Sequence, residues 1–184
     1  MKKLCYTLLI FVFTISSFAQ NNTFTDIRDG KVYKTVKIGT QTWMAENLAF
    51  KADSNSRAYN NNQNNVAKYG YLYNWETAKS VCPTGWHLPS KEEFENLINY
   101  CGGSNEAVYK ALIPGGSSGF SVTFGGWCRS FDDFVNIGLG AHFWSSSPNL
   151  EELAWNFYVY SFSEASMDTH YRLCGYSVRC LKDN

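Results

Sequence analysis

The sequence has no excess of charge of either sign. Lys and Arg number 16, Asp and Glu also number 16, and no basic run stands out. Proteins that bind nucleic acid usually carry a basic patch or stripe, so a nucleic-acid partner is not expected. Histidine is scarce, because only His87, His142 and His170 are present, and they form no H-x-x-x-H repeat. No two cysteines have C-x-x-C spacing either, which argues against a structural zinc site.

Long apolar runs and the common hydrolase signatures are missing as well. The sequence contains neither a G-x-S-x-G elbow nor an H-E-x-x-H pair. After the N-terminus no stretch approaches the roughly 20 apolar residues that a membrane helix needs, so no membrane span is expected. We therefore expect no catalytic constellation of these kinds, and no cofactor.

The N-terminus itself has the pattern of a Sec signal peptide. Two lysines follow Met1, the apolar run "LCYTLLIFVF" comes next, and the small residues Ser17 and Ala19 stand before Gln20. This pattern predicts a signal peptide over residues 1–19, and no cysteine at the cleavage point could take a lipid. The mature protein is therefore expected to be exported, to the periplasm, the cell surface or the medium.

Cysteine usage agrees with export. Of the 6 cysteines, Cys5 lies in the predicted signal peptide, and five remain: Cys82, Cys101, Cys128, Cys174 and Cys180. An odd number allows at most two disulfides and leaves one thiol.

Aromatic residues make up 17% of the chain, and 14 glycines accompany them. In an exported chain this composition is typical of many short strands and of binding by surfaces or grooves. Residues 20–184 are enough for a single domain and too few for two ordinary ones.

The first half of the mature chain begins with strands. Residues 24–48 alternate apolar and polar side chains, with Val32, Val36 and Ile38 on one face, and Asp29-Gly30 is a strong hairpin signal. A three-stranded meander is predicted there. Residues 51–68 are polar and rich in asparagine, which predicts a mobile surface loop.

Helices are predicted in the middle of the chain. Ser90 followed by Glu93 is a capping box, the apolar residues behind it recur at helical spacing, and Gly102-Gly103 supply an exit. A second short helix is predicted over 105–113. From Gly119 onward aromatic and β-branched residues predict strands, so the fold class is α+β with a mostly antiparallel C-terminal sheet and long loops.

Four segments together carry a resemblance to a known family. They are "VKIGTQTWMAENL" (36–48), "YLYNW" (71–75), "CPTGWHLPSKEEFENL" (82–97) and the tail with "FWSSS" and "GYSVRCLKD" (143–147 and 175–183). The chain resembles the Fibrobacter succinogenes major paralogous domain from about residue 24 to 183. The resemblance implies a C-type lectin-like fold, and it implies secreted or surface proteins without an assigned activity.

The resemblance also implies a disulfide. In the lectin-like fold the first helix and the last strand are tied together, which points to Cys82 with Cys180. Cys101 belongs to the apolar face of the predicted helix and suits the unpaired thiol. Cys128 and Cys174 are then left as a possible second bridge.

Most of the residues that form the known sites of lectin-like proteins are missing from this chain. Calcium-dependent sugar binding uses E-P-N or Q-P-D and W-N-D triplets, whereas "SPNLEE" and "AWNFY" lack the matching carboxylates. The copper-dependent oxidase relatives need two cysteines close together. Cys174 and Cys180 would lie about 20 Å apart in an extended strand. Fold alone does not give function.

Aromatic and amide side chains in the C-terminal loops are the best candidates for ligand contact. We expect binding near Trp127, Phe131, Phe134, Asn136 and Asn149, whereas His87 is interpreted as a corner histidine satisfied by hydrogen bonds. The function expected is calcium-independent binding of an extracellular glycan or a surface protein. The alternatives are a structural or adhesive surface module and, further away, an oxidase of the formylglycine-generating type.

Cleavage of the signal peptide gives a first testable expectation. Because Ser17 and Ala19 stand at the −3 and −1 positions, the exported protein should begin at Gln20. Intact-mass measurement of the exported protein checks this, and a product that retains residues 1–19 would contradict it.

Overall fold

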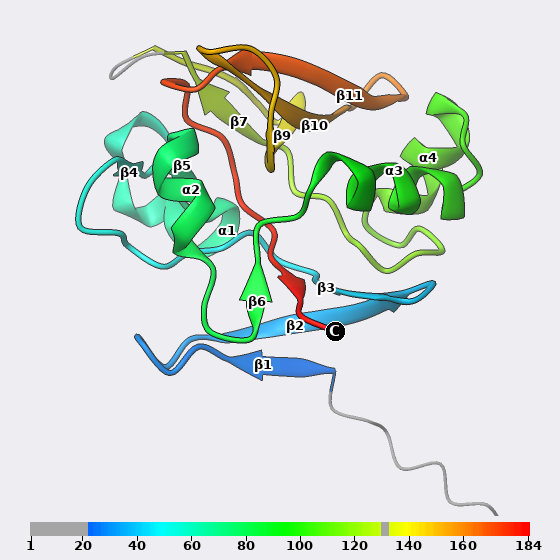
Figure 1. Cartoon of the computed structure of the whole chain (residues 1–184), viewed down its shortest axis with the longest axis horizontal. Coiled ribbons are helices and arrows are strands. Elements are labelled where there is room, and N and C mark those ends of the chain that lie inside the picture. The colour runs from blue at the N-terminus through cyan, green and yellow to red at the C-terminus, as the bar shows by residue number, and fades with distance from the viewer. Residues whose placement is uncertain (1–21, 130–132) are drawn as a thin grey trace, which may run out of the picture.

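The computed structural model describes residues 22–129 and 133–184 of the chain. The predicted signal peptide and Phe131 lie outside the described residues. Figure 1 shows a large sheet at the top, a small sheet at the bottom and two groups of helices between them. None of the helices in the described part is long and apolar enough to cross a membrane.

The small sheet contains both the first and the last strands of the described chain. Its order is β1-β2-β3-β12-β6. The strands are β1 (Thr23–Thr25), β2 (Val32–Ile38), β3 (Gln41–Met44), β6 (Trp86–His87) and β12 (Leu181–Lys182). The predicted meander is present, and Gly30 takes a positive φ of 74° in its first turn. Val32 is exposed, however, and the neighbouring Tyr33 on the other face is fully buried.

The large sheet is formed by the C-terminal half of the chain. Its strands are β7 (Gly125–Cys128), β8 (Phe134–Ile137), β9 (Gly140–Pro148), β10 (Leu153–Tyr160) and β11 (Glu164–Tyr171), in the order β11-β10-β9-β7-β8. All pairs are antiparallel except β7 with β9. The sequence did not single out β11, whose residues are mostly polar. The α+β class with a mostly antiparallel C-terminal sheet is confirmed.

Three helices of at least seven residues cover the sheets in the described part. They are α2 (Trp75–Val81), α3 (Lys91–Tyr100) and α4 (Asn105–Leu112). Ser90 caps α3 by accepting from the Glu93 amide, and the Glu93 carboxylate accepts from the Ser90 amide, as the capping box predicted. The apolar face of α3 then packs on the large sheet, where Phe94 stacks on Phe157 with ring centroids 5.2 Å apart.

The asparagine-rich segment is more regular than the sequence indicated. Residues 51–68 contain β4 (Ser56–Arg57), the 3₁₀ helices η1 (Tyr59–Asn61) and η2 (Gln63–Asn65) and most of α1 (Val66–Tyr69), and β4 pairs with β5 (Leu72–Tyr73). Buried Tyr59 anchors the segment. Asn60 and Asn61 take positive φ, which asparagine tolerates, and the Asn62 side chain caps η2. The asparagines therefore build turns.

Residues 172–184, called the C-terminal segment here, connect the two sheets. In Figure 1 this red segment descends from the large sheet through the centre of the molecule to the small sheet. Isolated bridges join Gly175 to Cys128, Tyr176 to Tyr73 and Ser177 to Phe143 before β12 begins. Only Leu181 and Lys182 form a regular strand, because the preceding residues bond to several different neighbours.

Arg179 lies fully buried in the middle of this segment. Its guanidinium donates to the Asn47 side chain, the Phe120 carbonyl and the Ser121 carbonyl, the first at 3.0 Å and the last at 2.9 Å. It also lies over the Phe120 ring, 4.3 Å from the centroid. Burial lowers the pKa of Arg179 to about 9, which leaves it charged at neutral pH.

Cys82 and Cys180 form a disulfide, the pairing that the family resemblance implied. The possible second bridge between Cys128 and Cys174 is not formed, and both are free thiols, as is Cys101. Cys128 lies opposite Gly175, and the two exchange backbone hydrogen bonds. Because side chains alternate along an extended chain, the Cys174 thiol points to the opposite face from that of Cys128.

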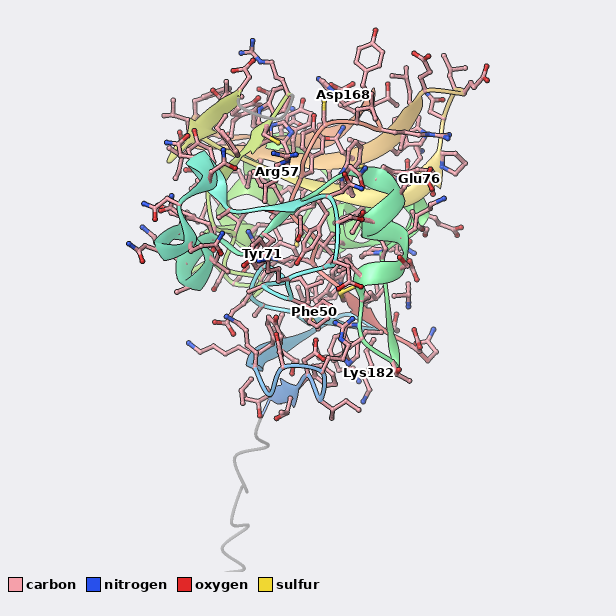
Figure 2. All side chains as sticks on the ribbon, turned by 90° about the vertical axis from the view of Figure 1, so that its left-hand side faces the viewer. Phe50, Arg57, Tyr71, Glu76, Asp168 and Lys182 are labelled. Atoms are coloured by element: carbon pink, nitrogen blue, oxygen red, sulfur yellow. A yellow bond between two sulfur atoms is a disulfide. The ribbon has the colours of Figure 1, made fainter. Side chains whose placement is uncertain are left out.

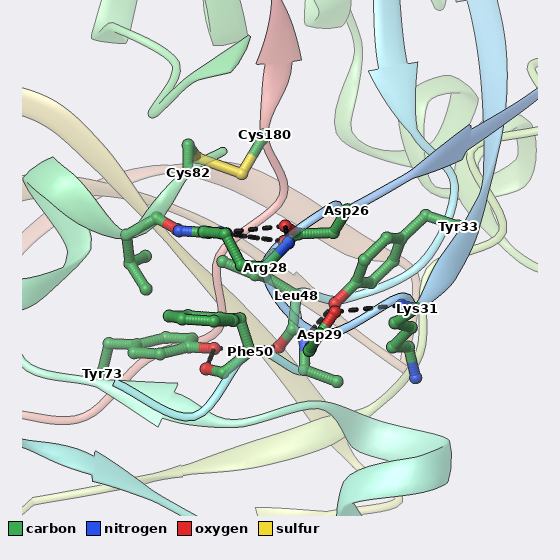
Figure 3. A network of polar contacts seen from close by, with 12 residues as sticks. Asp26, Arg28, Asp29, Lys31, Tyr33, Leu48, Phe50, Tyr73, Cys82 and Cys180 are labelled. Atoms are coloured by element: carbon green, nitrogen blue, oxygen red, sulfur yellow. Dashed lines mark hydrogen bonds and ion pairs between the residues drawn. A yellow bond between two sulfur atoms is a disulfide. The ribbon is translucent and has the colours of Figure 1, made fainter. Parts of the chain in front are cut away.

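The N-terminal hairpin is held on the domain by an ion pair whose carboxylate is buried and whose guanidinium is partly exposed. Asp26 is fully buried, and its carboxylate accepts from the Arg28 guanidinium at 2.6 Å. Figure 3 shows Arg28 reaching on to the end of α2, where it donates to the Val81 carbonyl at 2.9 Å, next to the Cys82–Cys180 disulfide. The guanidinium also lies 3.8 Å from the centroid of the Phe50 ring.

The corner before α3 is structural. His87 bonds Asp183 through Nδ1 at 2.6 Å and Glu93 through Nε2 at 3.0 Å, so it joins the helix start to the chain end. Trp86 beside it is buried, as are Trp43 and Trp144. The hydrogen bonds that the sequence interpretation assigned to His87 are present.

Replacing Arg179 with methionine should destabilise the protein strongly. The change roughly keeps the length of the side chain but leaves two buried oxygens, of Asn47 and Phe120, and the partly buried Ser121 carbonyl without this donor. Each buried unsatisfied group costs about 1–3 kcal/mol. We expect a loss of about 3 kcal/mol or more in the free energy of unfolding, measured by urea denaturation. Lys37→Met in β2, at an exposed position, is the control and should change little. Equal effects of the two substitutions would contradict the role of Arg179.

The histidine corner predicts a pH dependence of stability. Desolvation acts to lower the pKa of His87, but hydrogen bonds to Asp183 and Glu93 outweigh it and raise the pKa above 6.5. The stabilisation is therefore complete below the unfolded pKa and is lost as the pH rises through the folded value. Because the ring is partly exposed, we expect less than about 1 kcal/mol.

The measurement compares unfolding free energies of the parent protein and His87→Gln from pH 5.5 to 8.5. The difference in unfolding free energy in favour of the parent protein should decrease as the pH rises. A difference that stays constant across this range would show that the ionised ring contributes nothing to stability.

Candidate aromatic binding face

The large sheet carries aromatic rings on the face that lies opposite to α3 and α4. Strand pairing sets this arrangement, because His142 of β9 lies beside Tyr158 of β10, and Tyr158 lies beside Ser166 of β11. Alternate residues of β10 point to opposite faces, so Phe157 and Val159 enter the core while Tyr158 and Tyr160 point away from it. The name aromatic face is used below for Trp127, His142, Tyr158, Tyr160, His170 and Tyr176.

His142 lies at the centre of the aromatic face. Its ring centroid is 4.9 Å from that of Tyr176, 5.6 Å from that of Trp127 and 6.0 Å from that of Tyr158. His170 touches the other side of Trp127, with centroids 5.0 Å apart. Strands β7, β9, β10 and β11 and the C-terminal segment thus each contribute to one cluster of rings.

Hydrogen bonds fix the orientation of the exposed rings from below. His142 bonds the Tyr160 hydroxyl at 3.2 Å and the Asn156 side chain at 3.4 Å. The Asn136 amide donates to the same Tyr160 hydroxyl at 3.4 Å. The Tyr158 hydroxyl donates to Glu164 at 2.8 Å. Both tyrosine side chains are therefore held in place while they remain partly exposed to solvent.

The titratable groups of the aromatic face are held in neutral forms. Burial lowers the pKa of His142 to about 4, so the ring is uncharged at neutral pH. Burial also raises the pKa of Cys174 to about 11, and its thiol lies 3.2 Å from Nδ1 of His170. A protonated thiol is a poor nucleophile. The arrangement is suited to contact with a ligand more than to acid–base or thiol chemistry.

Two buried hydrogen-bonding groups in the floor of the face have no partner among the described residues. They are the indole N–H of Trp127 and the hydroxyl of Tyr176. Trp127 is only 8% exposed, and Tyr176 is fully buried. Unpaired buried polar groups are rare in native proteins, and each one needs a partner such as an ordered water or a ligand. Both groups lie in the same cluster of rings as the partly exposed Tyr158 and Tyr160, which distinguishes this part of the large sheet from the rest of it.

The rim of the face is exposed. Phe162 in the β10–β11 turn is 67% exposed and stacks on Tyr160, with centroids 5.0 Å apart and the planes inclined by 13°. Tyr158 continues the row on the other side of Tyr160 at 5.6 Å. Figure 2 shows Asp168 of β11 at this end of the molecule, far from Lys182 at the small sheet. The three rings form an open row along β10 and its turn.

A cavity of about 190 Å³ lies on the opposite side of β7 from the aromatic face. Its lining residues come from several segments, and they are Asn55, Arg57, Leu72, Asn74, Cys128, Arg129, Leu173 and Gly175. Burial raises the pKa of the Cys128 thiol. Glycine is needed at Gly175, since a Cβ there would approach the Cys128 sulfur to 2.6 Å. The cavity is small and has a protonated thiol in its wall.

The structure separates the residues that the sequence proposed for ligand contact. Trp127 belongs to the aromatic face, and Asn136 donates a hydrogen bond to Tyr160 of that face. Phe134 instead packs on Tyr59, 5.3 Å between centroids, on the other side of β7. Asn149 lies exposed in the β9–β10 turn, at the far end of β9 from Asn136. Phe131 lies outside the described residues.

The sequence missed the two histidines of the face. His142 and His170 are 28 positions apart in the numbering, and only the register of β9, β10 and β11 brings them to the same cluster. The alternation of Asn156, Tyr158 and Tyr160 was a usable signal for the β10 side of the face. Among residues 22–129 and 133–184, no three His, Cys, Asp or Glu side chains are placed to hold a metal together.

Comparison with known proteins bears on the identity of the chain. No curated protein and no solved structure matches it significantly. The family model of the Fibrobacter succinogenes major domain matches residues 36–182. This match covers well over half of the chain and contains α3, the large sheet and the C-terminal segment as far as residue 182. The chain therefore belongs to the Fibrobacter succinogenes major domain family.

Proposed function

We propose that this protein is an exported binding domain that takes an extracellular glycan on the aromatic face without calcium. The observation that carries the proposal is the row of Tyr158, Tyr160 and Phe162 at the surface, in which hydrogen bonds hold both tyrosine hydroxyls. Aromatic rings that are rigid and partly exposed stack well on the apolar face of a sugar ring. A protein at the cell surface is the other ligand that such a surface can take.

Pre-organisation favours binding by this face. A ligand that stacks on Tyr158 and Tyr160 need not order these side chains, because Glu164, His142 and Asn136 already hold their hydroxyls. Side-chain ordering otherwise costs about 0.5–1.5 kcal/mol for each immobilised side chain. The neutral His142 and the protonated Cys174 thiol support a binding role over a catalytic one.

We also propose that the architecture is C-type lectin-like and that residues 20–184 are one exported domain. Two features support this. The first and last strands of the described chain meet in one sheet, and a disulfide ties the residue after α2 to the residue before β12. A disulfide suits an oxidising compartment outside the cytoplasm.

The double substitution Tyr158→Ala with Tyr160→Ala tests the proposal. A glycan array identifies a ligand for the parent protein, and calorimetry then measures its affinity for both proteins, with and without a chelator. Loss of two stacking rings should weaken binding by about 1–3 kcal/mol, or roughly 5- to 150-fold. The chelator should have no effect.

Tyr100→Ala is the matched control, because Tyr100 ends α3 and is 65% exposed away from the large sheet. It should leave affinity unchanged. Circular dichroism must show that both variants are folded. Unchanged binding by the double variant, or binding that needs calcium, would sink the proposal.

A further inference from the structure

The aromatic face carries two carboxylates on its β11 side. Asp168 is exposed, and its carboxylate accepts only from the neighbouring Thr169 amide among the described residues. Glu164 is half-buried and accepts from the Tyr158 hydroxyl. Neither forms a salt bridge with a described lysine or arginine. Two negative charges therefore stand next to open tyrosine rings.

Both charges act on the tyrosines. The pKa of Tyr158 is raised to about 12, first by burial and then by the hydrogen bond to Glu164 and the charges of Glu164 and Asp168. The pKa of Tyr160 is raised by burial and by the same two carboxylates. Asp168 lies opposite Asn156 in the register, about halfway along β11, so it stands on the edge strand beside the tyrosines of β10.

Positive charge near this side of the face is already paired or absent at neutral pH. Arg129 at the β7 edge lies 5.8 Å from the centroid of Trp127, and its guanidinium is 3.6 Å from Asp133. Desolvation is the main cause that lowers the pKa of His170, so the ring is neutral at pH 7. The chain as a whole has no net charge, yet the β11 side of the face is acidic.

We infer that the ligand of this face is an amino sugar with a free ammonium group, carried on a chain of sugar units. The inference rests on the proposed function. Ammonium groups bind both to tyrosine faces, by cation–π attraction, and to carboxylates. The rings of Tyr158, Tyr160 and Phe162 follow one another along β10 and its turn and do not surround a single cation. They therefore fit successive sugar units better than one lysine side chain.

The test compares two oligosaccharides that differ only at the amine. The probes are a β-linked glucosamine hexamer and the N-acetylglucosamine hexamer, titrated at pH 5.5, where the free amines are protonated. We expect the parent protein to bind the amine form about fivefold tighter or better, with a preference that weakens in high salt. Asp168→Asn should remove most of the preference and leave affinity for the acetylated form unchanged.

Asp53→Asn is the charge-matched control, because Asp53 is exposed in the segment before β4. It should keep the preference for the amine form. Equal affinities of the parent protein for the two hexamers would overturn the inference, and so would a preference that survives in Asp168→Asn. If the two hexamers bind with equal affinity and Tyr158→Ala with Tyr160→Ala abolishes the binding of both, the proposed function stands while the amino-sugar inference falls. Stronger binding of an oligolysine peptide through Asp168 would also overturn the sugar assignment.

Discussion

The buried guanidinium of Arg179 is the contact on which the arrangement of the two sheets depends. It satisfies the Asn47 side chain and two carbonyls of the loop before β7, so three segments distant in sequence meet at one side chain. A buried charge without a carboxylate is costly unless its hydrogen bonds are satisfied. The next residue, Cys180, is fixed covalently to Cys82. Charge and disulfide together hold the C-terminal segment in the centre of the molecule.

The C-terminal segment also determines the geometry of the aromatic face. Tyr176 lies three residues before Arg179 and packs in the floor of the aromatic face, 4.4 Å from the centroid of Trp144. The same segment bonds β9 through Ser177 and β5 through Tyr176. The tyrosines that face solvent therefore stand on a floor that is part of the core. A surface supported in this way changes little in shape when a ligand arrives.

Local signals in the sequence were sufficient where a few neighbouring residues decide the structure. Ser90 with Glu93 placed the start of α3, and Asp29-Gly30 placed the first hairpin. The alternation of β10 contained the exposed tyrosines, but strand register brings His142 and His170 to them, and register depends on long-range pairing. For the same reason, the spacing of Cys128 and Cys174 could not reveal that their side chains lie on opposite faces.

The ion pair between the buried Asp26 and Arg28 lies outside the region that the family model matches. The family match begins at Val36, inside β2, whereas the pair lies upstream and reaches the end of α2 beside the disulfide. A boundary placed at residue 36 would divide a strand and remove a buried carboxylate together with its cation. The packed unit of this chain is thus longer than the matched region, because β1 pairs with β2 and Arg28 bonds the end of α2 from outside that region.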